Sequence, residues 1–352
     1  MWPFTSRPAA VLPAKSRSRF IVAGLGILTA ILVWLYFRSV PAERRAAALL
    51  SASGAVVQWD WGHIWKLRLD QQMADTSAVG AIADLPWLAN IDVTSRERAL
   101  ALAEVGTPSN WLRRIDVFVD DPLRNDAEDD RILEWISKCH GLDTISLRQV
   151  HPSAEAIGRF RELRNLKGLC IEGGGVDDGA MAQIGKLTQL TRLSVSRSDV
   201  GDVGANALTD VTQLKFLFLS RTRVTDAGIP AIARLQRLEE LQLSHCRISG
   251  LGISRLAALP SLKTLVLDDS RIEDADFAML EKLPELEVVS VRNTHITNKA
   301  LDSIRQMPHL KSIDVTGTDV DENAEVIIRS INRNLQYRLS PVQDMRKAKA
   351  NR

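Results

Sequence analysis

Three side chains of the kinds that hydrolases use recur about 24 residues apart, namely Ser220, His245 and Asp269. Brought side by side, a serine, a histidine and an aspartate can act as a nucleophilic triad. The other requirements of such a site are missing, since no glycine-flanked sharp turn holds Ser220 and no helix N-terminus points at it to stabilise an oxyanion. We therefore predict a polar surface row and no catalysis, with a hydrolase or enzyme subunit using these residues as the least favoured alternative.

A run of acidic side chains invites a metal-binding interpretation: Asp120, Asp121, Asp126, Glu128, Asp129 and Asp130. It lacks the alternating oxygen ligands and the central glycine of a compact calcium loop. Carboxylates directly ahead of Ile132 and Leu133 favour the start of a helix instead. We predict neither a metal site nor a cofactor, and the segment remains open as a recognition loop.

The three cysteines, Cys139, Cys170 and Cys246, are odd in number and widely spaced. They form neither a disulfide framework nor a zinc motif. Apolar neighbours place Cys139 on a buried helical face and Cys246 inside a turn, whereas Cys170 should point outward.

The elements that carry these residues follow from a strict period of 24 residues, which places a leucine at the head of each unit: Leu142, Leu166, Leu190, Leu214, Leu238, Leu262, Leu286 and Leu310. With that leucine as position 1, apolar residues recur at positions 4 and 6, which is the alternation of a strand with one buried face. The apolar spacing then lengthens to three, as in Ile229, Ile232 and Leu235. This change predicts a short helical return in each unit, and stacked units share one core.

The LxxLxL phrase at a fixed period of 24 resembles the leucine-rich repeat family. Position 9 holds small hydroxyl or thiol side chains in place of the common asparagine, which resembles the cysteine-type or bacterial branch, including its membrane-anchored members. The resemblance implies an α/β solenoid, or horseshoe, with a parallel concave sheet and short helices on the convex side. It also implies a protein that presents a binding surface to a partner.

The domain boundaries follow from the same pattern. Residues 64–339 hold about eleven units of 24 residues and a partial last strand, after a linker helix and N-terminal cap at 38–63. A basic tail is expected at 1–19 and a disordered basic tail at 340–352. Trp87 and Trp111 directly precede position 1 of successive units, so we expect them to stack along one flank.

The segment 20–37 is 18 residues long and carries no charge. As a helix it would span about 27 Å, and basic residues precede it, so it predicts one transmembrane signal-anchor helix. A cleaved signal peptide and a buried core helix are the alternatives. The expected location is the cytoplasmic (inner) membrane, in a single pass, with the repeats outside the cytoplasm.

The chain has a formal net charge of +2, and the four basic residues of 1–19 account for more than that excess. No strongly basic face for nucleic acid is therefore predicted. The predicted partner is a protein or envelope ligand, and a self-associating structural envelope protein is the alternative.

A ligand should contact the strand side chains that face away from the core, at positions 3, 5, 7 and 8. Phe216 and Phe218 stand there among arginines and a histidine, and aromatic and arginine side chains dominate binding interfaces. The predicted ligand-binding residues are Arg192, Arg197, Phe216, Phe218, Arg221, His245 and Val266. The plainer alternative is that the two phenylalanines only pack against aliphatic neighbours.

Overall fold

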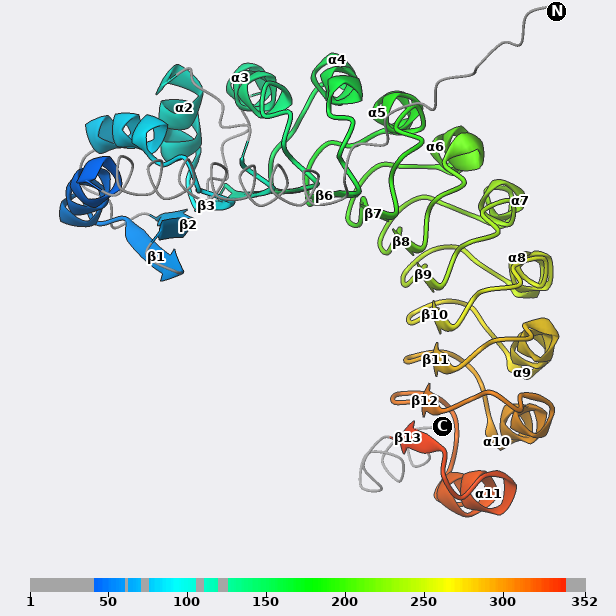
Figure 1. Ribbon diagram of the computed structural model, residues 1–352. Helices are drawn as coiled ribbons and strands as arrows, with labels where there is room; N and C mark the ends of the chain where they lie inside the picture. Colours follow the sequence, from blue (N-terminus) through cyan, green and yellow to red (C-terminus); the bar gives the residue numbers. More distant parts are fainter. Residues whose placement is uncertain (1–40, 61–62, 71–75, 106–110, 120–125, 340–352) are drawn as a thin grey trace, which may run out of the picture.

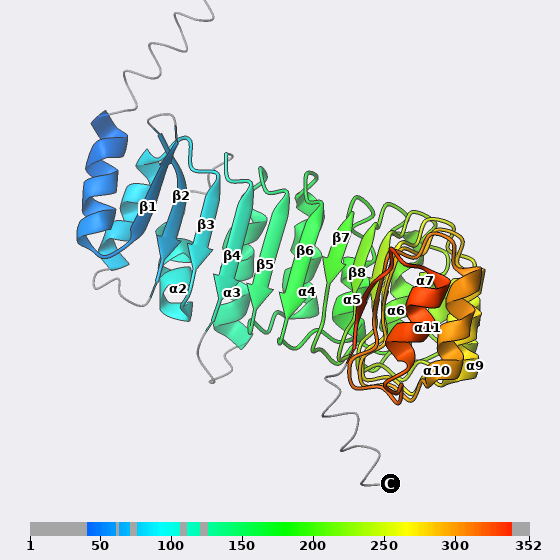
Figure 2. The same ribbon diagram turned by 90° about the horizontal axis from the view of Figure 1, so that it is seen from below.

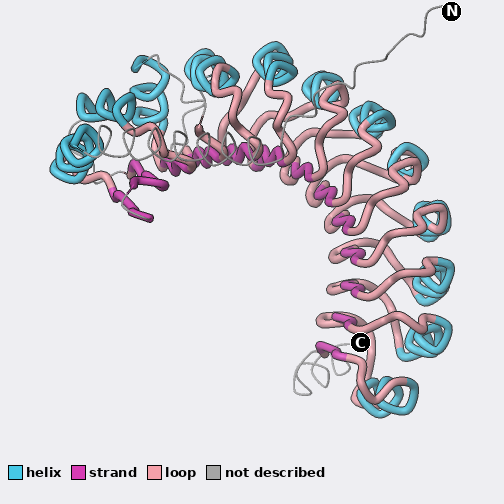
Figure 3. Tube along the Cα trace, in the orientation of Figure 1, coloured by secondary structure: helices cyan, strands magenta, loops and turns pink. Residues whose placement is uncertain are grey.

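The computed structural model describes residues 41–60, 63–70, 76–105, 111–119 and 126–339. They form a curved stack of units, with the strands on the inner, concave side and the helices on the outer, convex side (Figures 1 and 3). The chain passes from strand to helix and back in each unit. The structure thus confirms the predicted solenoid with its parallel concave sheet and convex helices.

The strands form one sheet in sequence order, in which β2 to β13 are parallel and β1 pairs antiparallel with β2 (Figure 2). Their bounds are β1 Val56–Asp60, β2 His63–Leu69, β3 Asn90–Val93, β4 Arg114–Phe118, β5 Thr144–Arg148, β6 Gly168–Glu172, β7 Arg192–Ser194, β8 Phe216–Phe218, β9 Glu240–Gln242, β10 Thr264–Val266, β11 Val288–Ser290, β12 Ser312–Asp314 and β13 Gln336–Arg338. Equivalent positions of successive units lie opposite each other, as in the pairs Arg192–Phe216 and Phe216–Glu240.

The convex side consists of short α-helices, several of which continue as 3-10 turns. Residues 41–52 are helical, and the later α-helices are α2 Arg96–Val105, α3 Asp126–Ser137, α4 Ala154–Gly158, α5 Asp178–Ile184, α6 Asp202–Asn206, α7 Ile229–Ile232, α8 Gly250–Leu256, α9 Asp274–Ala278, α10 Asn298–Leu301 and α11 Ala324–Ile331. The 3-10 segments are η1 Thr76–Asp84, η2 Arg159–Glu162, η3 Ala207–Asp210, η4 Met279–Lys282 and η5 Asp302–Gln306.

The core lies between the two layers and follows the sequence pattern. In the unit that begins at Leu214, positions 1, 4 and 6 and the helical Ile229 and Ile232 are all 0 % exposed. The same positions are buried in the neighbouring units, so the core is continuous along the stack. Each unit therefore depends on its neighbours for burial, as expected of a solenoid.

The regular strands are shorter than the apolar alternation suggests, because most units pair only at positions 3 to 5. The chain turns away at position 8, where the backbone is left-handed: Gln149, Gly173, Arg197, Arg221, His245, Asp269, Asn293 and Gly317 have φ between 53° and 75°. The prediction that put position 8 on the strand face is therefore wrong. Side chains at this position stand at the edge of the concave face, on a turn.

The side chain at position 9 closes that turn. Thr222 Oγ1 donates to the carbonyl oxygen of Leu219 at 2.7 Å, and Thr294 Oγ1 does the same to Val291. Cys246 has a thiol at this position, and it donates to the Leu219 oxygen of the preceding unit at 3.2 Å, while its own backbone amide donates to the Leu243 oxygen at 3.1 Å. A small donor at this position satisfies a buried carbonyl that the turn would otherwise leave without a partner.

A second set of contacts joins each unit to the next on the convex side, and we call it the aspartate ladder: Asp130, Asp178, Asp202, Asp226 and Asp274. Each of these carboxylates accepts a hydrogen bond from a backbone amide 23 residues further along the chain. Asn298 continues the series with its side-chain oxygen, which accepts from the amide of Asp321 at 3.0 Å. The ladder therefore ties neighbouring units by polar contacts in addition to the shared core.

The first units are covered by the helix at 41–52 and by β1. Glu43 is 0 % exposed, and its Oε2 lies 2.7 Å from Nδ1 of His63. The His63 ring contacts Trp87, which in turn contacts Trp111 at a centroid distance of 5.5 Å. The two tryptophans thus pack along one flank.

The segment 20–37 lies outside the described residues, as do the predicted tails at 1–19 and 340–352. Within the described ranges no helix is both long enough and apolar enough to cross a membrane. The longest α-helix with described bounds, α3, has 12 residues, or about 18 Å, against the roughly 30 Å of a hydrocarbon core. The structure therefore does not support the transmembrane helix of the predicted fold class or the single-pass membrane localisation, and neither prediction is kept.

Candidate binding surface on the concave face

The centre of the concave sheet carries a cluster of one arginine and two phenylalanines, which we call the aromatic cluster: Arg192, Phe216 and Phe218. Arg192 lies on β7, and its guanidinium carbon stands 4.0 Å from the ring centre of Phe216 and 5.5 Å from that of Phe218. The strand register explains the contact, because Arg192 lies directly opposite Phe216. Arg192 is exposed and both rings are half-buried, so the cluster presents a cation and aromatic edges to solvent.

Val266 belongs to the same face but not to the cluster. It stands on β10, separated from Phe218 by Gln242 of β9. It is half-buried, and Ser290 lies beside it on β11. The surface is therefore polar between its apolar members.

Arg197 and Arg221 occur elsewhere, at the edge of the concave face. They line a hollow of about 550 Å³, whose wall includes Phe118 and Arg148 from β4 and β5. The Arg148 guanidinium lies 5.3 Å from the centre of the Phe118 ring. Five of the seven predicted residues thus fall into two groups, the aromatic cluster at the centre and the arginine-lined hollow at the edge, whereas Val266 and His245 belong to neither.

The three side chains of the candidate triad do not come together in one site either. His245 Nε2 lies 3.2 Å from Oδ2 of Asp269, and both side chains are about one third exposed. Ser220 lines the arginine-lined hollow, and within the described residues no hydrogen bond joins its hydroxyl to His245. The arrangement is a solvent-exposed His–Asp contact beside a serine on another turn.

A second hollow, of about 670 Å³, lies at the N-terminal end of the concave face and was not anticipated from the sequence. Its wall includes Trp65 and Phe118, while Lys66 pairs with Asp92 at 2.6 Å and Arg114 with Asp116 at 2.6 Å. The hydrogen bond from Asp116 raises the pKa of Arg114. The signal that could have revealed it is the set of charged side chains at positions 3 and 5 of the first three units: Lys66, Arg68, Asp92, Arg114 and Asp116.

Comparison with known proteins agrees with this geometry. A family model described as Leucine Rich repeat matches residues 186–208 and 235–257, which are two of the stacked units. The chain therefore contains leucine-rich repeats. An internalin from Listeria monocytogenes has a similar structure, with a TM-score of 0.53, 16% sequence identity, and coverage of 85% of this chain and 90% of the internalin chain.

A leucine-rich repeat protein of Leptospira interrogans aligns with a TM-score of 0.49 and 14% identity, over 74% of each chain. Comparison with curated proteins finds no match. At 16% identity the likeness to the internalin shows a shared fold alone.

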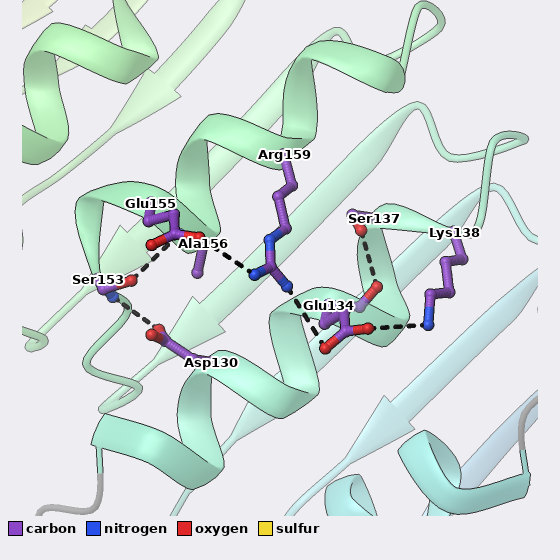
Figure 4. A network of polar contacts seen from close by, with 8 residues as sticks. All are labelled: Asp130, Glu134, Ser137, Lys138, Ser153, Glu155, Ala156 and Arg159. Atoms are coloured by element: carbon purple, nitrogen blue, oxygen red, sulfur yellow. Dashed lines mark hydrogen bonds and ion pairs between the residues drawn. The ribbon is translucent and has the colours of Figure 1, made fainter.

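In this leucine-rich repeat protein the acidic run begins a helix and holds the next unit. Asp129 is 0 % exposed, and its carboxylate accepts from Arg96 Nε at 3.1 Å and from the His151 amide at 2.7 Å. Asp130 accepts from the amide of Ser153, on the neighbouring unit (Figure 4). Residues 120–125 lie outside the described residues, and within the described ranges no group of three or more histidine, cysteine or acidic side chains is placed to hold a metal ion.

The polar network on the convex side continues from α3 to α4. Glu134 lies 3.0 Å from Lys138 Nζ and 3.4 Å from Arg159 Nη1, and Arg159 also approaches Glu155 (Figure 4). The hydrogen bond from Lys138 is the main reason that the pKa of Glu134 is lowered. These exposed pairs contribute little stability each, and they join the surfaces of two units.

The thiols of the leucine-rich repeat protein are poor nucleophiles. Burial raises the pKa of Cys139 to about 12 and is the main cause of the raised pKa of Cys246. Cys170 stands on the concave face as expected, but it is half-buried, and burial together with the Glu172 carboxylate raises its pKa to about 11. Because the thiolate is the reactive form, none of the three is poised for redox or covalent chemistry near neutral pH.

Proposed function

We propose that this leucine-rich repeat protein binds a protein ligand on its concave face, with the aromatic cluster at the centre of the contact and no catalytic step. The observation that carries the proposal is the stacking of Arg192 over Phe216 and Phe218 on the exposed side of the sheet. These side chains are not required by the core, since the core of the same strand is made by Leu217 on the opposite side. Nothing in the fold explains their presence at the surface.

The chemistry of the cluster suits a protein interface. Phenylalanine and arginine at the centre of a patch lose solvent on binding, and such residues supply most of the free energy at known interfaces. The guanidinium keeps spare donors for a carbonyl or carboxylate of the ligand while its face covers the rings. The strands beneath form a continuous sheet, so the cluster is presented on a rigid base.

The test is affinity capture with the full-length protein from extracts of the cells that produce it naturally. The variant Phe216→Thr with Phe218→Gln removes the rings and inserts residues that the chain itself uses at positions 3 and 5, in Thr264 and Gln242. The matched control is Val288→Thr, at position 3 of β11, three units away. Equal circular dichroism spectra show that each variant keeps the fold.

We expect the double variant to lose at least one partner that wild type and Val288→Thr both retain. Removing two central aromatic contacts costs on the order of 2 to 4 kcal/mol of binding, or roughly 30-fold or more in affinity. If all three proteins capture the same set with the same yield, the aromatic cluster is not a binding site and the proposal fails.

A further inference from the structure

The arginine-lined hollow at the edge of the concave face has an unusual charge pattern. Arg148, Arg197 and Arg221 all border it, and all three are exposed. Its remaining wall is neutral except for Glu172, whose Oε1 accepts a hydrogen bond from the hydroxyl of Ser194 at 2.5 Å. Three cations therefore face one shared space with a single carboxylate, which is itself hydrogen-bonded.

Several other cations on this face are paired with carboxylates or, in the case of Arg192, stacked on aromatic rings. Lys66 and Arg114 each lie 2.6 Å from an aspartate in the first units, and His245 lies 3.2 Å from Asp269 further along. Within the described residues no ion pair joins Arg148, Arg197 or Arg221 to an acidic side chain. The hollow thus gathers three guanidinium groups that no ion pair compensates, whereas Arg192 stands alone over Phe216 and Phe218.

The backbone at the hollow holds these arginines at an unfavourable conformation. Arg197 and Arg221 both have φ of 59°, a region that glycine or asparagine adopts more easily. Gly173, Asn293 and Gly317 occupy the equivalent position in other units. Gln149, His245 and Asp269 adopt this conformation as well, so the turn itself does not require arginine, and two arginines in succession place two cations at the hollow.

The shape of the hollow depends on the neighbouring glycine loop at 173–175. A side chain on Gly174 would meet the carbonyl oxygen of Val150 at 1.9 Å, so this loop packs as closely as glycine allows. Gly173, Gly174 and Gly175 also border a shallower space of about 360 Å³ with Arg197 and Arg221. The bare loop leaves room beside the guanidinium groups for a ligand side chain.

We infer that the arginine-lined hollow binds an acidic segment of the protein ligand, with carboxylates held by Arg148, Arg197 and Arg221. This inference rests on the proposed function and adds the chemistry of the ligand. Guanidinium groups bind carboxylates in bidentate pairs. Adjacent strands are about 4.8 Å apart, and side chains on one face of an extended peptide are about 7 Å apart. These spacings are similar enough for neighbouring long arginine side chains each to reach one acidic side chain of the peptide.

A short acidic peptide fits this face better than a long polyanion such as a sulfated or phosphorylated polymer. Carboxylates flank the hollow along the sheet: Asp92, Asp116, Glu240, Asp268 and Asp314. A polymer of uniform negative charge would meet these groups on either side, whereas a local acidic segment would not. Phe118 in the wall also offers an apolar contact to the stem of a glutamate.

The experiment measures binding of a fluorescein-labelled peptide of alternating glutamate and glycine to the full-length protein at about 50 mM salt. The test variant is Arg197→Asn with Arg221→Asn, because asparagine already occupies this left-handed position at residue 293 and will keep the turn. The control, Arg234→Asn with Arg271→Asn, removes the same charge from exposed sites outside the hollow. A glutamine–glycine peptide and dextran sulfate are the comparison probes.

We expect the glutamate peptide to bind wild type and the control alike, and the test variant about tenfold more weakly, which corresponds to about 1.4 kcal/mol. Equal weakening in the control, equal binding of the glutamine peptide, or no binding to wild type overturns the inference. Tighter binding of dextran sulfate with the same dependence on Arg197 and Arg221 also overturns it, in favour of a polyanion. The variant of Phe216 and Phe218 leaves the arginines in place, so failure here is distinct from failure of the proposed function.

Discussion

Removal of one carboxylate from the aspartate ladder tests how neighbouring units are held together. Asp202, the first residue of α6, accepts from the amide of Thr225 at 2.8 Å and from its hydroxyl at 2.7 Å. Asp274 makes the same pair of bonds to Thr297, at 2.6 and 2.7 Å. The substitution Asp202→Ala removes both acceptors and leaves the half-buried Thr225 amide without a partner.

The expected cost follows from these contacts. A hydrogen bond to a charged acceptor contributes about 1.5 to 3 kcal/mol when well shielded, and partial exposure of this site places each bond below that range. Two such bonds give a loss of about 2 to 3 kcal/mol in the free energy of unfolding. Asp202→Asn should cost only about 1 kcal/mol, because Asn298 performs the same role with an amide oxygen.

The assay is equilibrium unfolding in urea, followed by circular dichroism, on the full-length protein. Asp210→Ala is the control, since Asp210 is exposed in the same unit and removes the same charge. We expect the order wild type, Asp210→Ala, Asp202→Asn, Asp202→Ala, with the first two nearly equal. If Asp202→Ala falls within 0.5 kcal/mol of wild type, or Asp210→Ala costs as much, the ladder does not join the units as described.

Three further predictions concern packing, cation–π stacking and the thiols. Gly174→Ala should cost about 2 kcal/mol or more, because its methyl would lie 1.9 Å from a backbone oxygen, while Gly80→Ala, with nothing within 4 Å, should be neutral or slightly stabilising in the same urea assay. A double-mutant cycle between Arg192 and Phe216 should give a coupling of about 0.5 to 1 kcal/mol, and a coupling of zero would refute the stacking. Burial raises the pKa of three thiols, namely Cys139, Cys170 and Cys246, so the stability from this source is complete below the ordinary pKa of 9.0 and falls as the pH rises toward 12. The native thiols should therefore resist Ellman's reagent at pH 8 and react once the protein is unfolded, and rapid labelling of the native protein would contradict this prediction.

The sequence was sufficient to predict the solenoid and its core. The leucine at position 1 and the apolar residues at positions 4 and 6 can be buried only in one way, so the period alone places Leu214, Leu217 and Leu219 inside. The aromatic cluster was also accessible, because alternation along β8 puts Phe216 and Phe218 on one face. Strand register then brings Arg192 beside them.

The sequence was less informative where the chain leaves the strand. Hydrophobic alternation does not report a left-handed turn, so position 8 was placed on the strand face, although Gly173, Asn293 and Gly317 at that position were a usable signal. The separation of the candidate site into the aromatic cluster and the arginine-lined hollow depends on that turn. Apolar length alone misled the membrane prediction, since 18 uncharged residues satisfy the rule for a spanning helix without showing where the segment lies.

The aspartate ladder could be predicted from the sequence only in part. Asp202 and Asp226 recur at the repeat period, each just ahead of the apolar residues of a helical return. In the structure, threonine or serine caps the helix of its own unit, as Thr297 does for the amide of Lys299 at 3.3 Å. The aspartates instead reach the next unit, a contact that a pattern within one unit does not reveal.

Site-directed photo-crosslinking tests the central claim most directly. The full-length protein carries benzoylphenylalanine in place of Phe218 on the concave face or of Val203, 69 % exposed on the convex side, and is irradiated with the partner identified by capture. The concave binding site predicts a covalent adduct from residue 218 and little or none from residue 203. An adduct from residue 203 with none from residue 218 would contradict it and move the binding surface to the convex helices.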